Sequence, residues 1–201
     1  MKKNLCIEKM VAMALMSMML ILVSGCNKKE APSAPTDLSA ELNNDCIHLS
    51  WKKVPHADYY RITVGFQIRN NVNQLLSETR EVSLGEVSGT EYDDCFPFEG
   101  TNYYKIEAVN EYGSSPCSEV SCYYPVNETV FMYPNLSTGI VSVETDSINR
   151  IIISNLNGET LADLEMDCDI CTLSLAQFGS GVYIIHIFSN LGETIKRIVI
   201  V

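Results

Sequence analysis

The sequence predicts an all-β protein: two small antiparallel β-sandwiches in tandem, preceded by a signal peptide and a tether. Three observations support this fold class, namely short segments of alternating apolar and polar residues, β-branched runs near the C-terminus, and turn residues between them. Alternation with a period of two places one face of a strand in a core and the other in solvent. Residues 36–125 carry no convincing helical period, so packing of sheet on sheet is expected.

The first 25 residues are set aside before any folding argument. Lys2 and Lys3 form a basic start, and residues 10–23 form an uncharged run rich in Met and Leu. A membrane-spanning helix needs about 20 apolar residues, so this run is short for a span and has the length of a signal-peptide core. Residues 1–25 are therefore predicted to be a signal peptide.

The segment Leu-Val-Ser-Gly-Cys at residues 22–26 resembles the lipobox of bacterial lipoproteins. The resemblance implies cleavage before Cys26, acylation of its thiol, and attachment of the protein to a membrane through that lipid. The alternatives are an ordinary signal peptide followed by a chance cysteine, or a short membrane anchor.

Loss of residues 1–25, which carry three Lys and one Glu (net +2), would change the net charge from −11 to −13. Such an acidic surface repels nucleic acid, which is therefore not an expected partner.

Residues 26–35 are rich in Pro, Ala and Ser without hydrophobic period and are predicted to be a lipidated tether. Residues 36–125 then resemble a fibronectin type III domain. The matching segments are Ala-Pro-Thr-Asp-Leu at 34–38, Ile-His-Leu-Ser-Trp at 47–51, Ala-Asp-Tyr-Tyr-Arg-Ile at 57–62, and Gly-Thr-Asn-Tyr-Tyr-Lys-Ile-Glu-Ala-Val-Asn at 100–110.

This resemblance carries three structural expectations. Trp51 is the core residue of the sandwich. The corner position, where the family often has Tyr, is Asn102, so an amide or Tyr103 is expected to hold the corner. The strand that begins with Cys46 and the strand that ends near Cys95 are antiparallel neighbours in the family, so a Cys46–Cys95 disulfide is a candidate.

Residues 126–201 form a second strand-rich block. Residues 151–153 and 198–201 are β-branched runs, and Asn157-Gly158 and Asn190-Leu191-Gly192 are turn signals. The block resembles the type A C-terminal sorting domain of the Bacteroidota type IX secretion system, through Val-Phe-Met-Tyr-Pro-Asn at 130–135, Gly-Val-Tyr at 181–183 and the ending Lys-Arg-Ile-Val-Ile-Val. The resemblance implies a β-sandwich that the export machinery recognises and that is often cleaved and replaced by a surface anchor.

The two localisation signals are usually alternatives. In one interpretation the chain is an outer-membrane lipoprotein whose C-terminal block is a retained structural domain. In the other, that block is a working export signal of a secreted cargo. The sequence favours the first, because lipobox chemistry is local and a β-domain can persist without its recognition role. Whether the protein faces the periplasm or the surface stays open.

No catalytic residue, metal site or cofactor is predicted. His48, His56 and His186 lie outside any catalytic motif. The Cys168-Asp-Ile-Cys171 motif has no second metal-ligand pair and no βα context, so a local disulfide or two free thiols are expected. The acidic residues Glu91, Asp93, Asp94 and Glu99 lack a calcium-loop spacing and are interpreted as a solvated turn.

Two surface features remain as candidates. Alternation directs Tyr59 and Tyr103 outward on neighbouring strands, which predicts a contact surface for a polysaccharide or peptide; ordinary cross-strand packing is the alternative. Asp146-Ser147-Ile148 resembles the acceptor for protein O-glycosylation in Bacteroidota, at Ser147.

The sequence thus favours a non-enzymatic lipoprotein of the cell envelope that acts as a tethered interaction or spacer module. An envelope protein or a polysaccharide is the expected partner. The alternatives are a binding subunit that uses exposed Tyr residues, and a secreted cargo of the type IX system.

Overall fold

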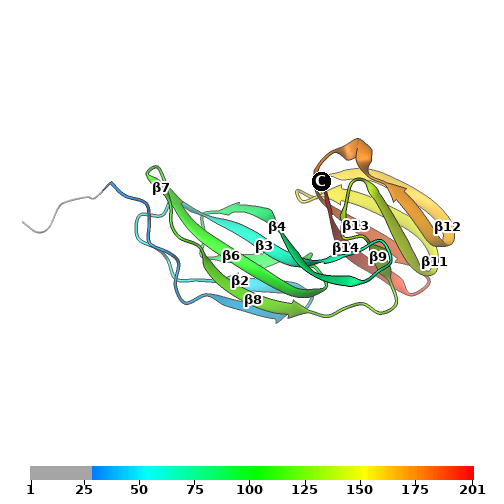
Figure 1. The fold of residues 1–201 in the computed structure, drawn as a ribbon, viewed down its shortest axis with the longest axis horizontal. Helices are drawn as coiled ribbons and strands as arrows, with labels where there is room; N and C mark the ends of the chain where they lie inside the picture. Colours follow the sequence, from blue (N-terminus) through cyan, green and yellow to red (C-terminus); the bar gives the residue numbers. More distant parts are fainter. Residues whose placement is uncertain (1–28) are drawn as a thin grey trace, which may run out of the picture. The chain divides into compact units, whose positions relative to one another are not determined.

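A computed structural model describes residues 29–201. The signal-peptide prediction for residues 1–25 and the lipidation of Cys26 fall outside these residues. No helix of the described part is long and apolar enough to cross a membrane. Within it the chain forms β-strands and one short 3₁₀ turn, η1 (Ala176–Phe178), so the all-β prediction is confirmed (Figure 1).

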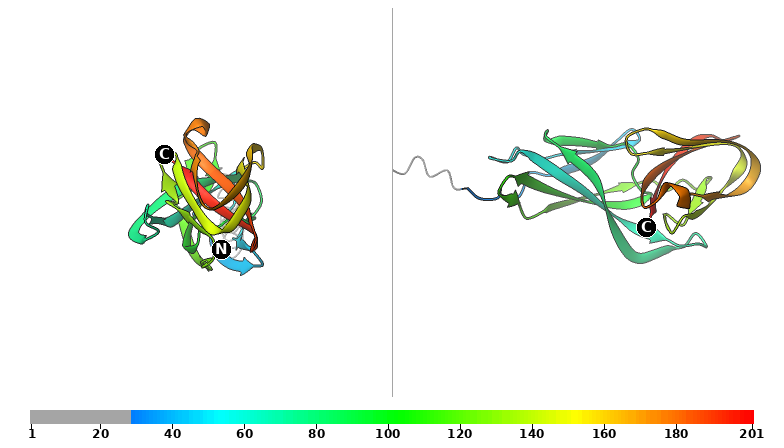
Figure 2. Two further views of the ribbon diagram at one scale, coloured as in Figure 1. Left: turned by 90° about the vertical axis from the view of Figure 1, so that its right-hand side faces the viewer. Right: turned by 90° about the horizontal axis from the view of Figure 1, so that it is seen from above.

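The first sandwich consists of two antiparallel sheets. One has the strand order β1-β2-β5, formed by β1 (Ser39–Asn43), β2 (Cys46–Ser50) and β5 (Glu91–Asp94). The other has the order β4-β3-β6, with β7 and β8 both pairing with β6; it comprises β3 (Tyr59–Arg69), β4 (Leu75–Val87), β6 (Gly100–Asn110), β7 (Gly113–Ser114) and β8 (Ser118–Tyr124). The long β3–β4 hairpin projects from its sheet (Figure 2).

The alternating residues of the sequence line the core of this sandwich. Ile47 and Leu49 of β2 face inward, as do alternate residues of β3 and β6 such as Ile62 and Ile106, all fully buried. Trp51 is 6% exposed and packs edge-on against Tyr60, with ring centroids 5.2 Å apart. Its predicted place in the core is therefore confirmed.

An amide holds the corner where β6 begins. The Asn102 side chain is fully buried, its Oδ1 accepts a hydrogen bond from the Phe98 N–H (3.0 Å), and its Nδ2 donates to the Phe98 carbonyl (2.7 Å). Tyr103, the other candidate for this role, is exposed. An asparagine suits the site because one side chain can satisfy both backbone groups of the same residue.

The second half of the predicted tether belongs to the folded sandwich. Pro32 and Pro35 are buried, and the Ser118 hydroxyl donates to the Pro35 carbonyl (2.6 Å). The prediction of a free tether over residues 26–35 is therefore wrong for residues 31–35. Proline supplies apolar surface without an N–H to satisfy, so a Pro-rich segment can pack along a sheet without joining it.

The second domain is one sheet of six strands that encloses its own core. The order is β10-β14-β13-β11-β12, with β9 also paired to β11. Its strands are β9 (Phe131–Tyr133), β10 (Leu136–Ser137), β11 (Ile140–Asn155), β12 (Thr160–Ser174), β13 (Gly181–Ser189) and β14 (Gly192–Ile200). The turns predicted at Asn157-Gly158 and Asn190-Leu191-Gly192 connect β11 to β12 and β13 to β14.

Strand β11 pairs with β12 along one edge and changes partner along its other edge in mid-course. Its first part pairs with β9, its last part pairs with β13, and the shift lies between Glu144 and Ile148. Val141 and Val143 from the first part and Ile151 and Ile153 from the last part belong to one buried core. A β-bulge increases local twist, which lets one sheet fold over itself.

The Gly139→Ala substitution is expected to destabilise the second domain by about 3 kcal/mol, because strain and overpacking add at this site. Gly139 has φ +125°, and an added Cβ would lie 2.7 Å from Cβ and 2.9 Å from Cα of Ala176. Gly192→Ala is the matched control, since Gly192 has φ +107° but open space around it. Denaturant unfolding in which both variants lose equal stability would contradict the steric argument.

Candidate functional site

The two tyrosines proposed as a joint surface lie far apart. Tyr59 is paired with Val109 and Tyr103 with Gly65, six residues further along β3. At about 3.3 Å per residue this is a separation of about 20 Å along the strands. Tyr59 and Tyr103 therefore do not form one contact surface, and that prediction is wrong.

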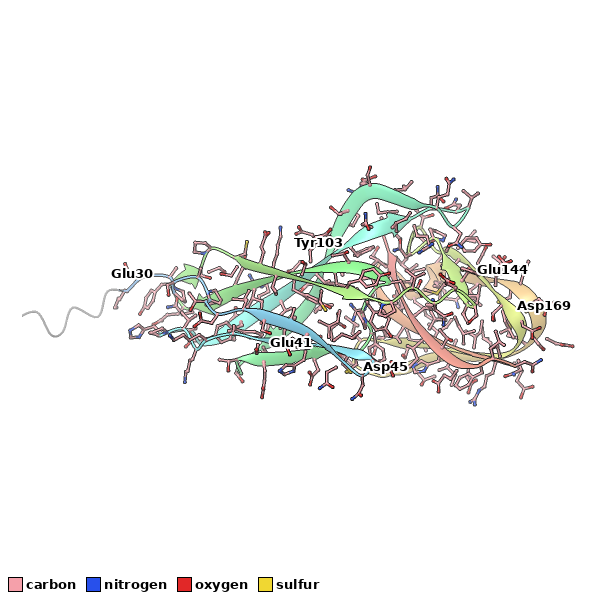
Figure 3. The ribbon with its side chains drawn as sticks, turned by 90° about the horizontal axis from the view of Figure 1, so that it is seen from below. Glu30, Glu41, Asp45, Tyr103, Glu144 and Asp169 are labelled. Carbon is pink, nitrogen blue, oxygen red and sulfur yellow. A yellow bond between two sulfur atoms is a disulfide. The ribbon has the colours of Figure 1, made fainter. Side chains whose placement is uncertain are left out.

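Tyr103 instead has an exposed aromatic neighbour on β8. Tyr103 is paired with Ser121, which places Tyr123 on the diagonal, about 7–8 Å away on the same face. The side chains of Tyr103 (labelled in Figure 3) and Tyr123 are 44% and 58% exposed. Gly65, which is paired with Tyr103 on the adjoining strand, has no side chain that could cover the tyrosine ring. The sequence contains Tyr123, but only the β6–β8 register brings it to Tyr103.

Charged residues cover the rest of this outer face. Lys105 pairs with Glu81 (2.7 Å) and Glu119 (3.5 Å), and Arg61 pairs with Glu86 and Glu107 (3.3 Å each). These cross-strand pairs are exposed, and such pairs contribute little to stability. They give the face around the two tyrosines a solvated and acidic character, because four carboxylates surround two cations.

The Cys46–Cys95 disulfide is present, with a Cα–Cα distance of 3.9 Å. Cys46 begins β2, and Cys95 follows the last residue of β5, the partner strand of β2. The predicted Cys46–Cys95 disulfide is therefore confirmed. The bridge links residues 49 apart in the sequence and closes the end of the three-stranded sheet.

Cys168 and Cys171 are free thiols, so a local disulfide is not formed. Cys171 faces the core beside Val143, whereas Cys168 is paired with Ile148 beyond the bulge in β11. Burial raises the pKa of the Cys171 thiol to about 12, and the neighbouring Cys168 adds to the rise. Of the other cysteines in the described part, Cys117 and Cys122 are also free.

Alkylation at pH 8 is expected to modify Cys171 far more slowly than exposed Cys117. Only the thiolate reacts, and a pKa of about 12 for Cys171 lowers the thiolate fraction about a thousand-fold relative to an ordinary thiol. Peptide mass spectrometry after timed exposure to iodoacetamide measures both rates in one sample. Equal rates at Cys117 and Cys171 in the folded protein would contradict the burial of Cys171.

Ser147, the candidate acceptor for O-glycosylation, lies within β11 at the register shift. Its backbone has φ +52°, and its N–H donates to the Asp169 carboxylate (2.9 Å). Asp146 beside it is exposed. The structure therefore places the motif at an irregular point of the strand.

Two of the four acidic residues interpreted as a solvated turn pair with cations of β14; Asp94 is buried and Glu99 is partly buried. Asp94 ends β5 and forms an ion pair with Arg197 of β14, with both side chains 1% exposed. Glu99 pairs with Lys196, whose side chain is 7% exposed. The solvated-turn interpretation is wrong for Asp94 and Glu99, because both carboxylates pair with cations of β14. These cations lie about a hundred residues away in the sequence, so the local spacing of the acidic residues does not reveal the pairs.

Further groups complete the environment of Arg197. One guanidinium nitrogen lies 3.1 Å from Oδ2 of Asp94, and the guanidinium carbon lies 5.2 Å from the centre of the Phe98 ring. The Tyr104 hydroxyl donates to the same Oδ2 of Asp94 (2.9 Å). A carboxylate that accepts several hydrogen bonds and a guanidinium that lies over a ring can both be buried at reduced cost.

Asn135 adds a network of neutral hydrogen bonds to the same contact. Its Oδ1 accepts from the Arg69 N–H (2.8 Å), and its Nδ2 donates to the Gln67 carbonyl (2.9 Å) at the end of β3. Its own carbonyl accepts from the Val199 N–H of β14 (3.0 Å). The residue after the cis Tyr133-Pro134 bond thus links the first sandwich to the last strand.

A pocket of about 560 Å³ lies beside these residues. The first sandwich contributes Phe96, Phe98 and Glu99, and β14 contributes Lys196 and Arg197. Within the described residues no group of three or more His, Cys, Asp or Glu side chains has the arrangement of a metal site. We call the set of Asp94, Glu99, Asn135, Lys196 and Arg197 the junction.

Alkaline pH is expected to destabilise the protein through Tyr104. Burial raises the pKa of this phenol, and the Asp94 carboxylate raises it further. A raised folded-state pKa means that the contribution to stability is complete below the unfolded pKa of about 10 and is lost as the pH rises above it. Above that pH, one such group lowers the free energy of unfolding by about 1.4 kcal/mol for each pH unit.

Tyr104→Phe removes this titration, and Tyr103→Phe is the matched control at an exposed ring. Denaturant unfolding between pH 9 and 11 should show a shallower loss of stability for Tyr104→Phe alone. An unchanged slope in that variant would contradict the expectation.

The comparison with known families decides the nature of the second domain. Residues 131–201 match the secretion system C-terminal sorting domain family. The match begins at the first residue of β9 and ends at Val201, so it spans β9 to β14. This sorting domain implies a protein of the cell envelope or a secreted protein.

Solved structures similar to the chain include several fibronectin type III domains. The fn3 domain of the human collagen alpha-1(XX) chain is 18% identical, with 52% of this chain and 93% of that chain covered and a TM-score of 0.35. A two-domain fibronectin type III segment from chicken tenascin is 14% identical, with 83% and 98% covered and a TM-score of 0.34.

The crystal structure of FN3tt is 22% identical, with 45% of this chain and 91% of that chain covered and a TM-score of 0.33. No curated protein matches the chain.

Proposed function

We propose that the chain is an exported protein of the bacterial cell envelope, carried out of the cell by its sorting domain through a type IX secretion system. The observation that carries this proposal is the family match over residues 131–201, which covers every strand of the second domain. The domain has its own buried core, with fully buried residues such as Val141, Ile151 and Ile198.

The match shifts the balance between the two interpretations of the sequence. A retained structural domain would need only to fold, whereas a working signal must also keep the features by which its family is recognised. The match to the family supports the second interpretation, that of an exported cargo.

Cell fractionation tests the proposal directly. The full chain is produced in a host with an intact type IX system and in the same host without it. We expect the protein in the outer-membrane and extracellular fractions of the first host and in the periplasm of the second. An identical distribution in the two hosts would refute export by this route.

The first sandwich is proposed to be a non-enzymatic interaction or spacer module, displayed by the sorting domain. Its outer face carries exposed ion pairs in which Lys105 and Arg61 each contact two glutamates. His48 of this sandwich contacts the exposed carboxylate of Asp93 on the neighbouring strand, and His186 of the second domain contacts Glu193 in the same way. These arrangements favour a solvated surface over a catalytic cleft.

Attachment through Cys26 is a separate part of the proposal. The lipobox-like segment supports it, and two or three acyl chains would hold the chain to a membrane. Metabolic labelling with a fatty-acid analogue should label the wild-type chain and the Cys6→Ala control but not the Cys26→Ala variant. Labelling of the Cys26→Ala variant would show that Cys26 is not the site of lipid attachment.

The Tyr103–Tyr123 pair favours a second candidate function, capture of a polysaccharide. Two exposed rings on one sheet face offer apolar platforms with polar edges, which suit the faces of sugar rings. Affinity electrophoresis in polysaccharide-containing gels is expected to retard the wild type but not Tyr103→Ala/Tyr123→Ala. Tyr112→Ala, at another exposed ring (43%), is the control. Equal migration of all three proteins would exclude this function.

A further inference from the structure

The last strand of the sorting domain is covered on both faces. From Lys196 to Ile200 every residue of β14 is buried. Ile198 and Ile200 belong to the core of the sorting domain, whereas Val199 belongs to the core cluster of the first sandwich. Because neighbouring residues of a strand point to opposite faces, Arg197 and Val199 lie on the face that the sandwich covers.

The covered face is an apolar patch with a basic centre. Val182 of β13 and Leu136 of β10 also pack against the core cluster of the sandwich. Apolar patches of this kind, when exposed, mark surfaces that bind another protein. In this chain the sandwich occupies the face, so any other protein that binds there must displace it.

The sandwich shows which chemistry fits this face. On this face it presents the Asp94 carboxylate and the Phe98 ring to Arg197. Its Glu99 carboxylate contacts Lys196, the preceding residue of β14, whose place in the alternation is that of Ile198. These contacts join residues 97 to 103 positions apart, and the Asn135 network fastens the adjoining segment to the end of β3. The partner that suits the face is therefore a protein surface with carboxylates and an aromatic ring.

We propose that the first sandwich acts as a built-in cover for the β13–β14 face of the sorting domain, and that this face is available to the export machinery only when the junction opens. The inference rests on the proposed export function and adds its regulation. Opening withdraws Val199 from the core cluster of the sandwich, but it breaks no strand pairing, because no sheet of the described residues contains strands of both domains.

Glu99→Gln is the variant that weakens the cover without altering the sorting domain. Glu99 belongs to the loop between β5 and β6. Its carboxylate accepts a hydrogen bond from the Asn127 N–H (2.8 Å), and the side-chain oxygen of a glutamine can accept the same bond. Glu81→Gln is the matched control, since it breaks the exposed pair with Lys105 in the same sandwich.

Two readouts separate opening from export. A dicarbonyl reagent measures access to Arg197, whose side chain is 1% exposed, relative to Arg80, whose side chain is 54% exposed. Pulse-chase measures the rate at which the full chain leaves cells with an intact secretion system. We expect Glu99→Gln to raise both the Arg197 modification rate and the export rate about three-fold or more over Glu81→Gln.

Other outcomes overturn the inference. Faster modification of Arg197 without faster export would show that the cover does not regulate export. An unchanged modification rate would show that the Glu99–Lys196 pair does not hold the junction closed. If the wild type itself leaves cells equally well without the secretion system, the proposed function fails and the regulatory role with it, while the modification rates still report whether the cover opens.

Discussion

The Asp94→Ala variant is expected to lose about 3–5 kcal/mol of stability, because it leaves the Arg197 charge buried without its partner. Both side chains of the pair are 1% exposed, and Asp94 also accepts the Tyr104 hydroxyl. Removal of this one carboxylate therefore leaves two buried donors with fewer acceptors. Denaturant unfolding at pH 7, followed by fluorescence and circular dichroism, measures the loss.

The adjoining residue supplies the matched control. Asp93 pairs with His48 (2.7 Å), but its side chain is 63% exposed, so Asp93→Ala is expected to cost less than about 1 kcal/mol. The double variant Asp94→Leu/Arg197→Met should be more stable than Asp94→Ala, because it leaves no unpaired charge. Similar losses for Asp94→Ala and Asp93→Ala would refute the buried pair.

Removal of the Cys46–Cys95 bridge is expected to have the second large effect. The bridge closes a loop between residues 49 apart. Such a cross-link lowers the conformational entropy of the unfolded chain, which stabilises the folded state by about 4 kcal/mol. The double variant Cys46→Ala/Cys95→Ala should lose about this amount, with Cys117→Ala as a control at an exposed free thiol.

Reduction provides an independent reading of the same bridge. A thiol reductant should lower the denaturation midpoint of the wild type and of Cys117→Ala to that of the double variant, and leave the double variant unchanged. A wild-type midpoint that does not respond to complete reduction would contradict a stabilising role for the disulfide.

The strands and their inward faces could be predicted because side-chain alternation has the same period as the strand. Ile47, Leu49, Ile62 and Ile106 are buried as that pattern requires. The two hairpin turns carry their own signal, since Gly158 and Gly192 both adopt positive φ. These features are local, and local sequence is enough to specify them.

Features that depend on register or on the bulge could not be predicted. Alternation correctly turned Tyr103 outward, but the pairing of β6 with β3 and β8 decides that its neighbour is Tyr123 and not Tyr59. Likewise, the bulge in β11 decides how Cys168 and Cys171 are placed on β12. Register is a property of two strands, so one strand's sequence does not specify it.

The junction could not be predicted for a related reason. Asp94 and Arg197 are 103 residues apart, and each lies in a segment that has an ordinary explanation by itself: an acidic turn and a basic strand end. Only the packing of β14 on the sandwich brings them together. Buried ion pairs between distant segments leave no periodic signal in the sequence.

Topology measured on intact cells tests the central claim, export of the chain by its sorting domain, most directly. An epitope is inserted at Val72, which is 70% exposed in the turn between β3 and β4. In cells with a working secretion system, we expect an added protease or antibody to reach this epitope without permeabilisation. An epitope that stays protected until the outer membrane is opened would contradict the account.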